Sequence, residues 1–118
     1  MNSSIFPVVF VKNNQLLLYK EKTKILIADI VLLEAHKNYT CLYMCNGKKL
    51  VVPKTLKLFE DLLANHNFYR IHRTFLINYA HLKNYNSDLG EVYLTGNVKA
   101  TTSRRRKLDF EVQINCLS

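Results

Sequence analysis

Cysteine, glycine and proline are all scarce in this sequence, which has three cysteines, three glycines and two prolines. An odd number of cysteines without zinc-type spacing indicates neither a disulfide framework nor a structural metal. We therefore expect core cysteines in a reduced, cytosolic protein that needs no cofactor. Because no proline-rich or glycine-rich linker, repeat or low-complexity segment interrupts the chain, we interpret residues 1–118 as one domain.

Long apolar runs are also missing. The run over residues 25–33 contains Asp29 and is far shorter than the roughly 20 residues that a membrane-spanning helix needs. Residues 1–4 lack the basic start of a secretory signal. These absences predict a protein with no membrane segment.

Clustered catalytic residues are absent as well. The four histidines are scattered, and the acidic residues of the second half lie away from His72 in sequence. Metal hydrolases and two-metal nucleases need clustered histidine or carboxylate ligands, so we expect neither an enzyme nor a metal site. A metal-independent nuclease stays open as an alternative, because it needs only a general acid/base such as His72 and a nearby cation.

Positive charge is what the sequence has in excess. Its 17 Lys and Arg against 9 Asp and Glu give a net charge of +8, which favours a polyanionic partner. Arg70, His72 and Arg73 crowd into four positions between apolar neighbours, and a second basic cluster occupies residues 99–107. Arginine forks and Ser/Thr hydroxyls suit phosphate oxygens and the edge of guanine. The two clusters together therefore predict a nucleic-acid-binding protein.

Strand patterns dominate the chain, and two of them meet at strong hairpin signals. The expected strands are an N-terminal hairpin or docked arm over residues 8–11 and 16–19, a central strand over 25–33, a hairpin over 39–45 and 48–52 around Asn46-Gly47, and another over 91–95 and 98–102 around Gly96-Asn97. The fold class that follows is mostly β, with small antiparallel sheets.

Two further segments complete the expected fold. Leu56, Phe59 and Leu63 repeat at helical spacing, which predicts one short amphipathic helix over about residues 55–64. Residues 108–116 alternate apolar and polar side chains, and this period of two predicts a C-terminal strand. Such an edge strand could pair with another chain.

The run F-Y-R-I-H-R-T-F-L-I-N at residues 68–78, followed by His81-Leu82, resembles the signature of the LytTR family. Supporting marks lie in the expected order at residues 29–35, 54–63 and 103–105. The resemblance covers about residues 15–107. It leaves residues 1–14 as an N-terminal arm or strand and residues 108–118 as a C-terminal strand, whereas members of the family are more often helical there.

LytTR domains are DNA-binding output domains of bacterial transcriptional regulators. The resemblance implies sequence-specific binding of duplex DNA, with bases read in the major groove from loops and with a homodimer on paired half-sites. A receiver domain usually precedes such a domain, and 118 residues leave no room for one. We therefore expect a stand-alone regulator or a fragment, for which a separate signalling partner could supply the signal.

The resemblance also assigns candidate residues. The family's base-contacting positions fall on Arg73, on Arg105 and, in the loop after Asn38, on Tyr39 or Thr40. The candidates for contacts to the DNA backbone or for support of the loops are Arg70, His72, Thr74, Asn78, Lys99, Ser103, Arg104 and Lys107. We expect His72 to be a structural pin that hydrogen-bonds across the site. The seven tyrosines leave one alternative open, a basic β-rich module that stacks the bases of RNA or single-stranded nucleic acid.

Overall fold

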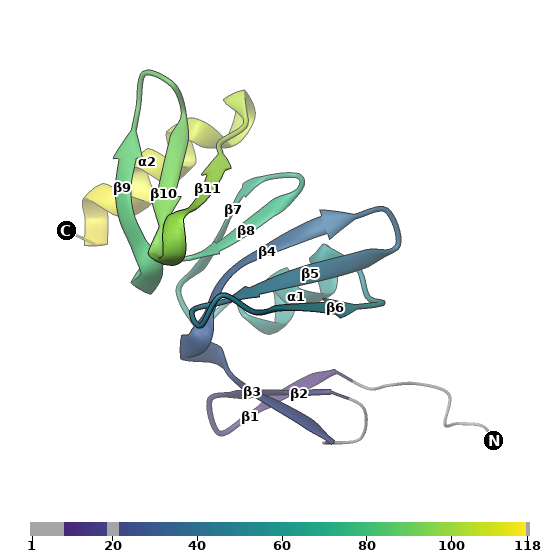
Figure 1. The fold of residues 1–118 in the computed structure, drawn as a ribbon. Coiled ribbons are helices and arrows are strands. Elements are labelled where there is room, and N and C mark those ends of the chain that lie inside the picture. The colour runs from purple at the N-terminus through teal and green to yellow at the C-terminus, as the bar shows by residue number, and fades with distance from the viewer. Residues whose placement is uncertain (1–8, 19–21, 118) are drawn as a thin grey trace.

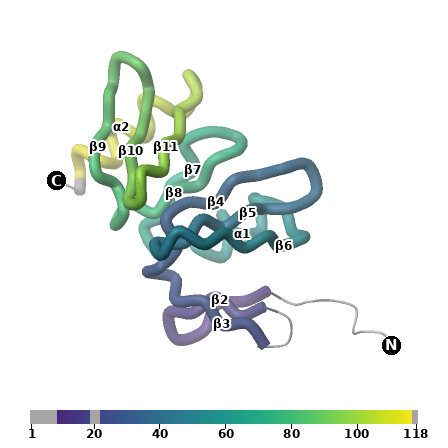
Figure 2. Tube along the Cα trace, in the orientation of Figure 1, coloured from purple at the N-terminus to yellow at the C-terminus, as the bar shows by residue number. Residues whose placement is uncertain are grey.

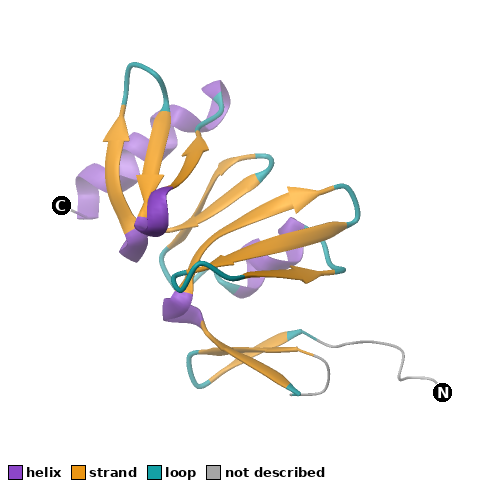
Figure 3. Ribbon diagram, viewed as in Figure 1, coloured by secondary structure: helices purple, strands orange, loops and turns teal. Residues whose placement is uncertain are grey.

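The structure is a computed structural model that describes residues 9–18 and 22–117. This part of the chain forms three antiparallel sheets and two α-helices (Figure 1). The sheets lie one after another along the molecule, with the central, five-stranded sheet between the two smaller ones (Figure 3). The mostly β fold class expected from the sequence is confirmed.

The N-terminal sheet has the strand order β1-β2-β3. Its strands are β1 (Phe10–Lys12), β2 (Gln15–Leu18) and β3 (Thr23–Leu26). Asn13 and Asn14 form the turn between β1 and β2 with positive φ angles of 53° and 61°, which asparagine tolerates better than most residues. The predicted hairpin is present, although its predicted ends at residues 8 and 19 lie outside the described residues.

The central strand predicted over residues 25–33 is wrong as a single strand. A short 3-10 helix, η2 (Ile27–Asp29), divides the run, so that its first part ends β3 and its second part begins β4. The run is mostly apolar because both sheets bury side chains from it, including Ile25 and Ile30. Periodicity alone does not locate such a break.

The central sheet has the strand order β6-β5-β4-β8-β7, which places β4 in the middle. Its strands are β4 (Ile30–His36), β5 (Tyr39–Met44), β6 (Lys49–Val52), β7 (Phe68–His72) and β8 (Phe75–Asn78). The predicted hairpin around Asn46-Gly47 joins β5 to β6. Gly47 turns the chain there with φ 88°, and its N–H donates to the Met44 carbonyl at 3.0 Å.

The third sheet has the strand order β11-β10-β9. Its strands are β9 (Leu82–Asn86), β10 (Glu91–Leu94) and β11 (Val98–Thr101), and two short 3-10 helices, η3 (Tyr79–His81) and η4 (Thr95–Asn97), precede β9 and β11. The predicted hairpin around Gly96-Asn97 is confirmed. His81 ties this sheet to η2, because its ring nitrogens lie 2.9 Å from Thr95 Oγ1 and 2.7 Å from the Ala28 carbonyl oxygen.

Two apolar cores cover opposite faces of the central sheet. The first includes Phe59 and Leu56 of α1 (Leu56–Leu62), together with side chains of the N-terminal sheet. The predicted short helix is therefore confirmed, with bounds slightly inside 55–64. The second core joins β4, β7 and β8 to the third sheet and to Phe110 of the second helix.

The C-terminal strand predicted over residues 108–118 is wrong, because the chain forms a second helix, α2 (Arg104–Leu117), at this end (Figures 1 and 2). Phe110 is only 3% exposed, and Ile114, one turn later, packs on the same core. Leu108 and Val112 point to solvent and are 71% and 52% exposed. An alternation of period two also contains pairs four residues apart, so burial of one such pair is enough to select the helix. The expected pairing of this segment with another chain as an edge strand is therefore wrong as well.

Candidate nucleic-acid interface

Three loops meet at one end of the central sheet. The N–H of Ala35, near the end of β4, donates to the Thr74 carbonyl in the β7–β8 turn at 2.9 Å. The N–H of Ser103, just after β11, donates to the Ile71 carbonyl of β7 at 2.8 Å. Figures 1 and 2 show the β4–β5 and β7–β8 turns on the same side of the molecule, with the β11–α2 junction above them. The end of the sheet thus gathers the three segments that carry the predicted site residues.

Arg70 braces the β7–β8 turn from within. Its Nη1 lies 2.7 Å from Glu60 Oε1 of α1, its Nε donates to the His72 carbonyl at 3.0 Å, and its Nη2 donates to the Arg73 carbonyl. The Arg70 side chain is only 14% exposed. Its guanidinium is therefore occupied by the protein itself, which suits support of the loop rather than contact with a phosphate.

His72 closes the same turn. Its Nδ1 accepts the N–H of Thr74 at 3.1 Å and lies 2.8 Å from the Thr74 hydroxyl oxygen. Because Nδ1 is an acceptor, the proton of the neutral ring sits on Nε2. The ring also packs against Phe75, with 5.7 Å between ring centroids. This geometry is that of a pin within the turn, and it leaves the Arg73 side chain exposed beside it.

The β11–α2 junction presents the second basic cluster on the start of a helix. The Ser103 hydroxyl accepts the N–H of Arg106 at 3.2 Å, and the Ser103 carbonyl accepts the N–H of Lys107 at 3.0 Å. Ser103 thereby satisfies donors that the first turn of a helix leaves unpaired. Arg104 and Arg105 remain exposed on this turn.

A hollow of about 370 Å³ lies where the turn and the junction meet. Its lining residues are His72, Arg73, Ser103, Arg105 and Arg106. The two basic clusters, about 30 positions apart in sequence, thus form one surface with three arginines and no carboxylate among its lining residues. Such a surface favours an anionic ligand, and phosphate above all.

Arg106 was not among the predicted site residues. Its Nη1 donates to the Arg70 carbonyl at 3.3 Å, so it links α2 directly to β7. The sequence signal was present, because Arg106 stands in the same basic run as Arg105. Its inward position follows from the helix, which the strand interpretation of the tail concealed.

Four of the predicted residues line this hollow, and several of the others are buried or paired elsewhere. Thr40 is fully buried, and its hydroxyl donates to the Lys54 carbonyl at 2.7 Å. Asn78 is buried too, and its side-chain amide donates to the Ile30 carbonyl at 2.9 Å. Lys99 lies on β11, where its Nζ is 3.3 Å from Glu91 Oε2.

Tyr39 is the solvent-facing member of the pair predicted in the β4–β5 loop, with 39% of its surface exposed. Its ring stacks on His36 with 5.2 Å between centroids and 13° between planes. Burial excludes the Thr40 side chain from direct contact with a ligand in this structure. Tyr39 therefore remains as the candidate of this loop.

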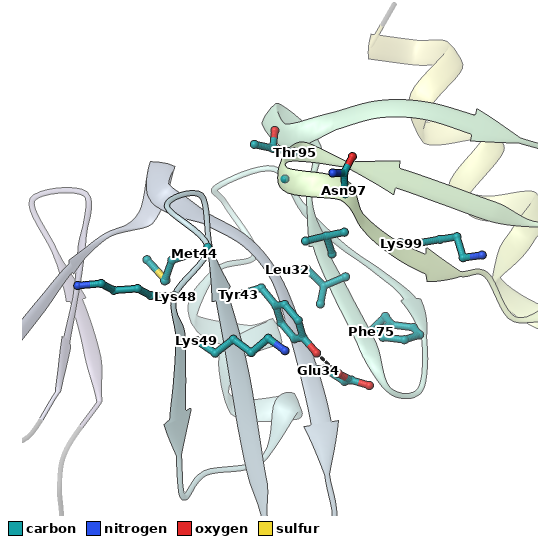
Figure 4. Close-up of a pocket in the computed structure, with 13 residues that line it drawn as sticks. Leu32, Glu34, Tyr43, Met44, Lys48, Lys49, Phe75, Thr95, Asn97 and Lys99 are labelled. Carbon is teal, nitrogen blue, oxygen red and sulfur yellow. Dashed lines mark hydrogen bonds between the residues drawn. The ribbon is translucent and has the colours of Figure 1, made fainter.

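A second hollow, of about 410 Å³, separates the central sheet from the third sheet (Figure 4). The Tyr43 hydroxyl donates to Glu34 Oε1 at 2.7 Å inside it. This hydrogen bond, helped by burial, raises the pKa of Tyr43 above its ordinary value. The Lys49 Nζ lies 4.8 Å from the centre of the Tyr43 ring. Sequence reasoning had not linked Glu34 and Tyr43 to any site.

Among residues 9–18 and 22–117, no group of three or more His, Cys, Asp or Glu side chains could hold a metal ion. No helix in this described part of the chain has the length and apolar character needed to cross a membrane.

A family model described as the LytTr DNA-binding domain matches residues 20–115. No curated protein matches the chain. A similar solved structure is the LytTr DNA-binding domain of a putative methyl-accepting/DNA response regulator from Bacillus cereus, with a TM-score of 0.71 and 19% sequence identity over 91% of this chain and 94% of that chain. At this identity, the likeness shows a shared fold.

Proposed function

The chain belongs to the family of LytTr DNA-binding domains, and from this membership we propose that it is a bacterial transcriptional regulator that binds duplex DNA sequence-specifically. Bases are read in the major groove by the loops at the end of the central sheet. Neither helix is the reading element in this proposal, although the first turn of α2 carries one of the reading arginines.

The observation that carries the proposal is the hollow at which Arg73 and Arg105 converge. Arg73 stands on a turn that Arg70 and His72 brace, and Arg105 stands on a helix start that Ser103 caps. A guanidinium on a rigid support can present its two parallel donors to O6 and N7 of guanine. We assign base reading to these two arginines, and to Tyr39 in the neighbouring loop.

The remaining predicted residues divide by their contacts. Arg104, Lys107 and Lys99 are proposed to contact phosphates, since each is at least partly exposed on α2 or β11. The residues proposed to support the loops are Arg70, His72, Thr74, Asn78 and Ser103. Two copies would bind paired half-sites, and a separate signalling partner would supply the regulatory input.

A competition titration tests the base-reading roles. A binding site is first selected from random duplexes, and each variant is then titrated against this site and a scrambled duplex at one salt concentration. Arg73→Ala and Arg105→Ala should cost about 1–3 kcal/mol on the selected site and little on the scrambled one. Lysine at either position should fail to restore specificity, because lysine keeps the charge and loses the fork.

The matched controls are Lys99→Ala and Lys107→Ala, which should weaken binding to both duplexes alike. If Arg73→Ala also lowers the two affinities equally, Arg73 is a phosphate clamp and its base-reading role is wrong.

Salt dependence and ligand class test the proposal more broadly. The logarithm of duplex affinity should fall with the logarithm of salt concentration by roughly 0.9 per phosphate neutralised. A nearly flat salt titration would contradict duplex binding. Tighter binding of single-stranded DNA or structured RNA at the same salt would favour the alternative of a single-strand or RNA binder.

A further inference from the structure

One face of the β4–β5 hairpin carries a row of side chains that runs from the inter-sheet cleft to the hairpin tip. Leu32 pairs with Tyr43, Glu34 with Cys41, and His36 with Tyr39 across the two strands. Alternate residues of a strand share a face, so these pairs lie above one another on the same side of the sheet. We call Tyr43, Glu34, His36 and Tyr39 the polar ladder.

The members of the polar ladder contact each other in order. Glu34 Oε1 accepts the Tyr43 hydroxyl at 2.7 Å and lies 3.3 Å from His36 Nε2. The His36 ring then stacks on Tyr39, with centroids 5.2 Å apart and planes 13° apart. Figure 4 shows the Tyr43–Glu34 end of this chain on the side of the cleft. One carboxylate oxygen thus links the cleft to the exposed ring at the tip.

A close contact between two polar side chains at the surface is often incidental. Two features distinguish the pair of Glu34 and His36. The Glu34 side chain is largely covered, and the same oxygen is held by the Tyr43 hydroxyl. The carboxylate therefore has a fixed position from which it orients the His36 ring.

The oriented His36 ring in turn restricts Tyr39, at the start of β5. Its ring has one face covered by His36 and still exposes part of its surface to solvent. A ring that is already oriented loses less conformational freedom when it binds. The polar ladder thus restricts the one aromatic side chain that the β4–β5 loop offers to DNA in the proposed function.

We propose that Glu34 and His36 are positioning residues that hold the Tyr39 ring for its contact with DNA. This inference rests on the proposed function and adds two residues that neither the signature nor the basic clusters indicate. Glu34 acts through its negative charge, although negative charge near a polyanion weakens binding in general. Removal of the Glu34 charge should therefore lower specific binding if Glu34 positions Tyr39, and raise binding if Glu34 only repels DNA.

The first experiment uses Glu34→Gln, which keeps an acceptor for Tyr43 and removes the charge that attracts His36. If Glu34 were only a nearby charge, this variant would bind the selected site and the scrambled duplex more tightly by the same factor. The proposal instead expects the ratio of selected to scrambled affinity to fall roughly three- to tenfold. Asp61→Asn is the matched control, because Asp61 forms an exposed ion pair with Lys57 on α1, and it should leave the ratio unchanged.

Replacements of His36 separate stacking from general disruption. His36→Ala removes the ring and should lower the affinity ratio as much as Glu34→Gln does or more. His36→Phe keeps an aromatic face for Tyr39 and should recover part of the ratio. If the affinity ratio of His36→Ala were closer to the native value than that of His36→Phe, the proposal would be overturned.

A double-mutant cycle with Tyr39→Ala tests whether Glu34 acts through Tyr39. If Glu34 acts through Tyr39, then Glu34→Gln should not lower the affinity ratio further once Tyr39 is alanine. Additive losses would mean that Glu34 acts elsewhere and would overturn the proposal. Aromatic NMR signals give an independent readout: those of Tyr39 should shift in free Glu34→Gln protein and stay unchanged in Asp61→Asn.

Failure of this proposal is distinguishable from failure of the proposed function. If Tyr39→Ala leaves both affinities unchanged while Arg73→Ala still lowers the selected-site affinity, DNA reading by the arginines stands and the positioning role is overturned. If no variant of Arg73, Tyr39, Glu34 or His36 changes the affinity ratio, the proposed function and the positioning role both fail.

Discussion

The β7–β8 turn and the β11–α2 junction present arginines to the same hollow, but different parts of the structure hold them in place. In the turn, Arg70 and His72 bond to main-chain groups within three residues of themselves, and Glu60 adds one contact from α1. In the junction, the position of Arg105 depends on α2, which is anchored to the third sheet by Phe110 and Glu111.

This difference separates local from tertiary support. The turn should keep its shape as long as its own side chains are intact. The junction is tied to β7 by the Ser103 N–H and by Arg106. The helical turn that carries Arg105 depends in addition on the docking of α2, whose anchors lie one to two helical turns further along. Substitutions that remove one kind of support should therefore affect one arginine and spare the other.

The largest effect is expected from Phe110→Ala, which breaks the tertiary support. Phe110 is buried and its ring meets Tyr85 edge to face at 5.2 Å. Its truncation leaves a cavity and should lower the free energy of unfolding by about 3–5 kcal/mol in a urea titration. Val112→Ala on the exposed face of the same helix is the control and should change it by no more than about 0.5 kcal/mol.

Amide NMR signals sharpen this test. In folded Phe110→Ala, the signals of the β11–α2 junction should move, while those of the β7–β8 turn should stay largely in place. Equal changes in both segments would show that the two supports are not independent.

A smaller effect is expected when the local support is removed by Glu60→Gln. The Arg70 guanidinium then loses its charged partner at 2.7 Å in a partly covered site. Solvent screening reduces the loss from that of a fully buried pair, so we expect about 1–2 kcal/mol of destabilisation. Lys57→Ala breaks the exposed pair with Asp61 on the same helix and serves as the control. An equal loss in the two variants would contradict a bracing role for Arg70.

The smallest effect is expected from Glu111→Gln, and it should depend on pH. Hydrogen bonds from Tyr85 at 2.5 Å and from Ser87 at 2.7 Å lower the pKa of Glu111 below its ordinary value of 4.5. A carboxylate with a lowered pKa adds stability above its unfolded-state pKa, and this stability is lost as the pH falls through the folded-state value. The native protein should therefore melt at a higher temperature than the variant at pH 7, and the difference should disappear in acid.

At alkaline pH, the stability that this hydrogen-bonded pair contributes should fall as the pH rises. Burial, together with the Glu111 hydrogen bond, raises the pKa of Tyr85 to about 12 from 10.0. Stability from this pair should be present below pH 10.0 and fall as the pH rises toward about 12. A melting difference that stays constant from acid to neutral pH would contradict the role of the Glu111 carboxylate.

Local signals made much of the fold predictable. Asn46-Gly47 and Gly96-Asn97 determine their hairpins because turns with positive φ need such residues. The end of the chain was harder, since one pattern fits two structures. The residues around Phe110 alternate like a strand, and the packing of Phe110 against Tyr85 favours the helix instead.

In the candidate site, too, one sequence pattern is compatible with more than one arrangement of side chains. The resemblance assigns base reading to Arg73 and leaves Arg70 between a contact to the DNA backbone and support of the loop, and nothing in the spacing decides between these two roles. Glu60, ten positions before Arg70 and on another element, decides that Arg70 is internal. Thr40 likewise could not be separated from Tyr39 until the alternation of β5 was fixed by its partners.

The hydrogen bond from the Ser103 N–H to the Ile71 carbonyl has a consequence for how this surface can diverge. It joins the two arginine-bearing segments through main-chain atoms, which every residue except proline can supply at position 103. The spacing between positions 73 and 105 is therefore insensitive to the side chains that occupy them. Descendants of this sequence can exchange either arginine and acquire a new ligand preference while the geometry of presentation is inherited unchanged.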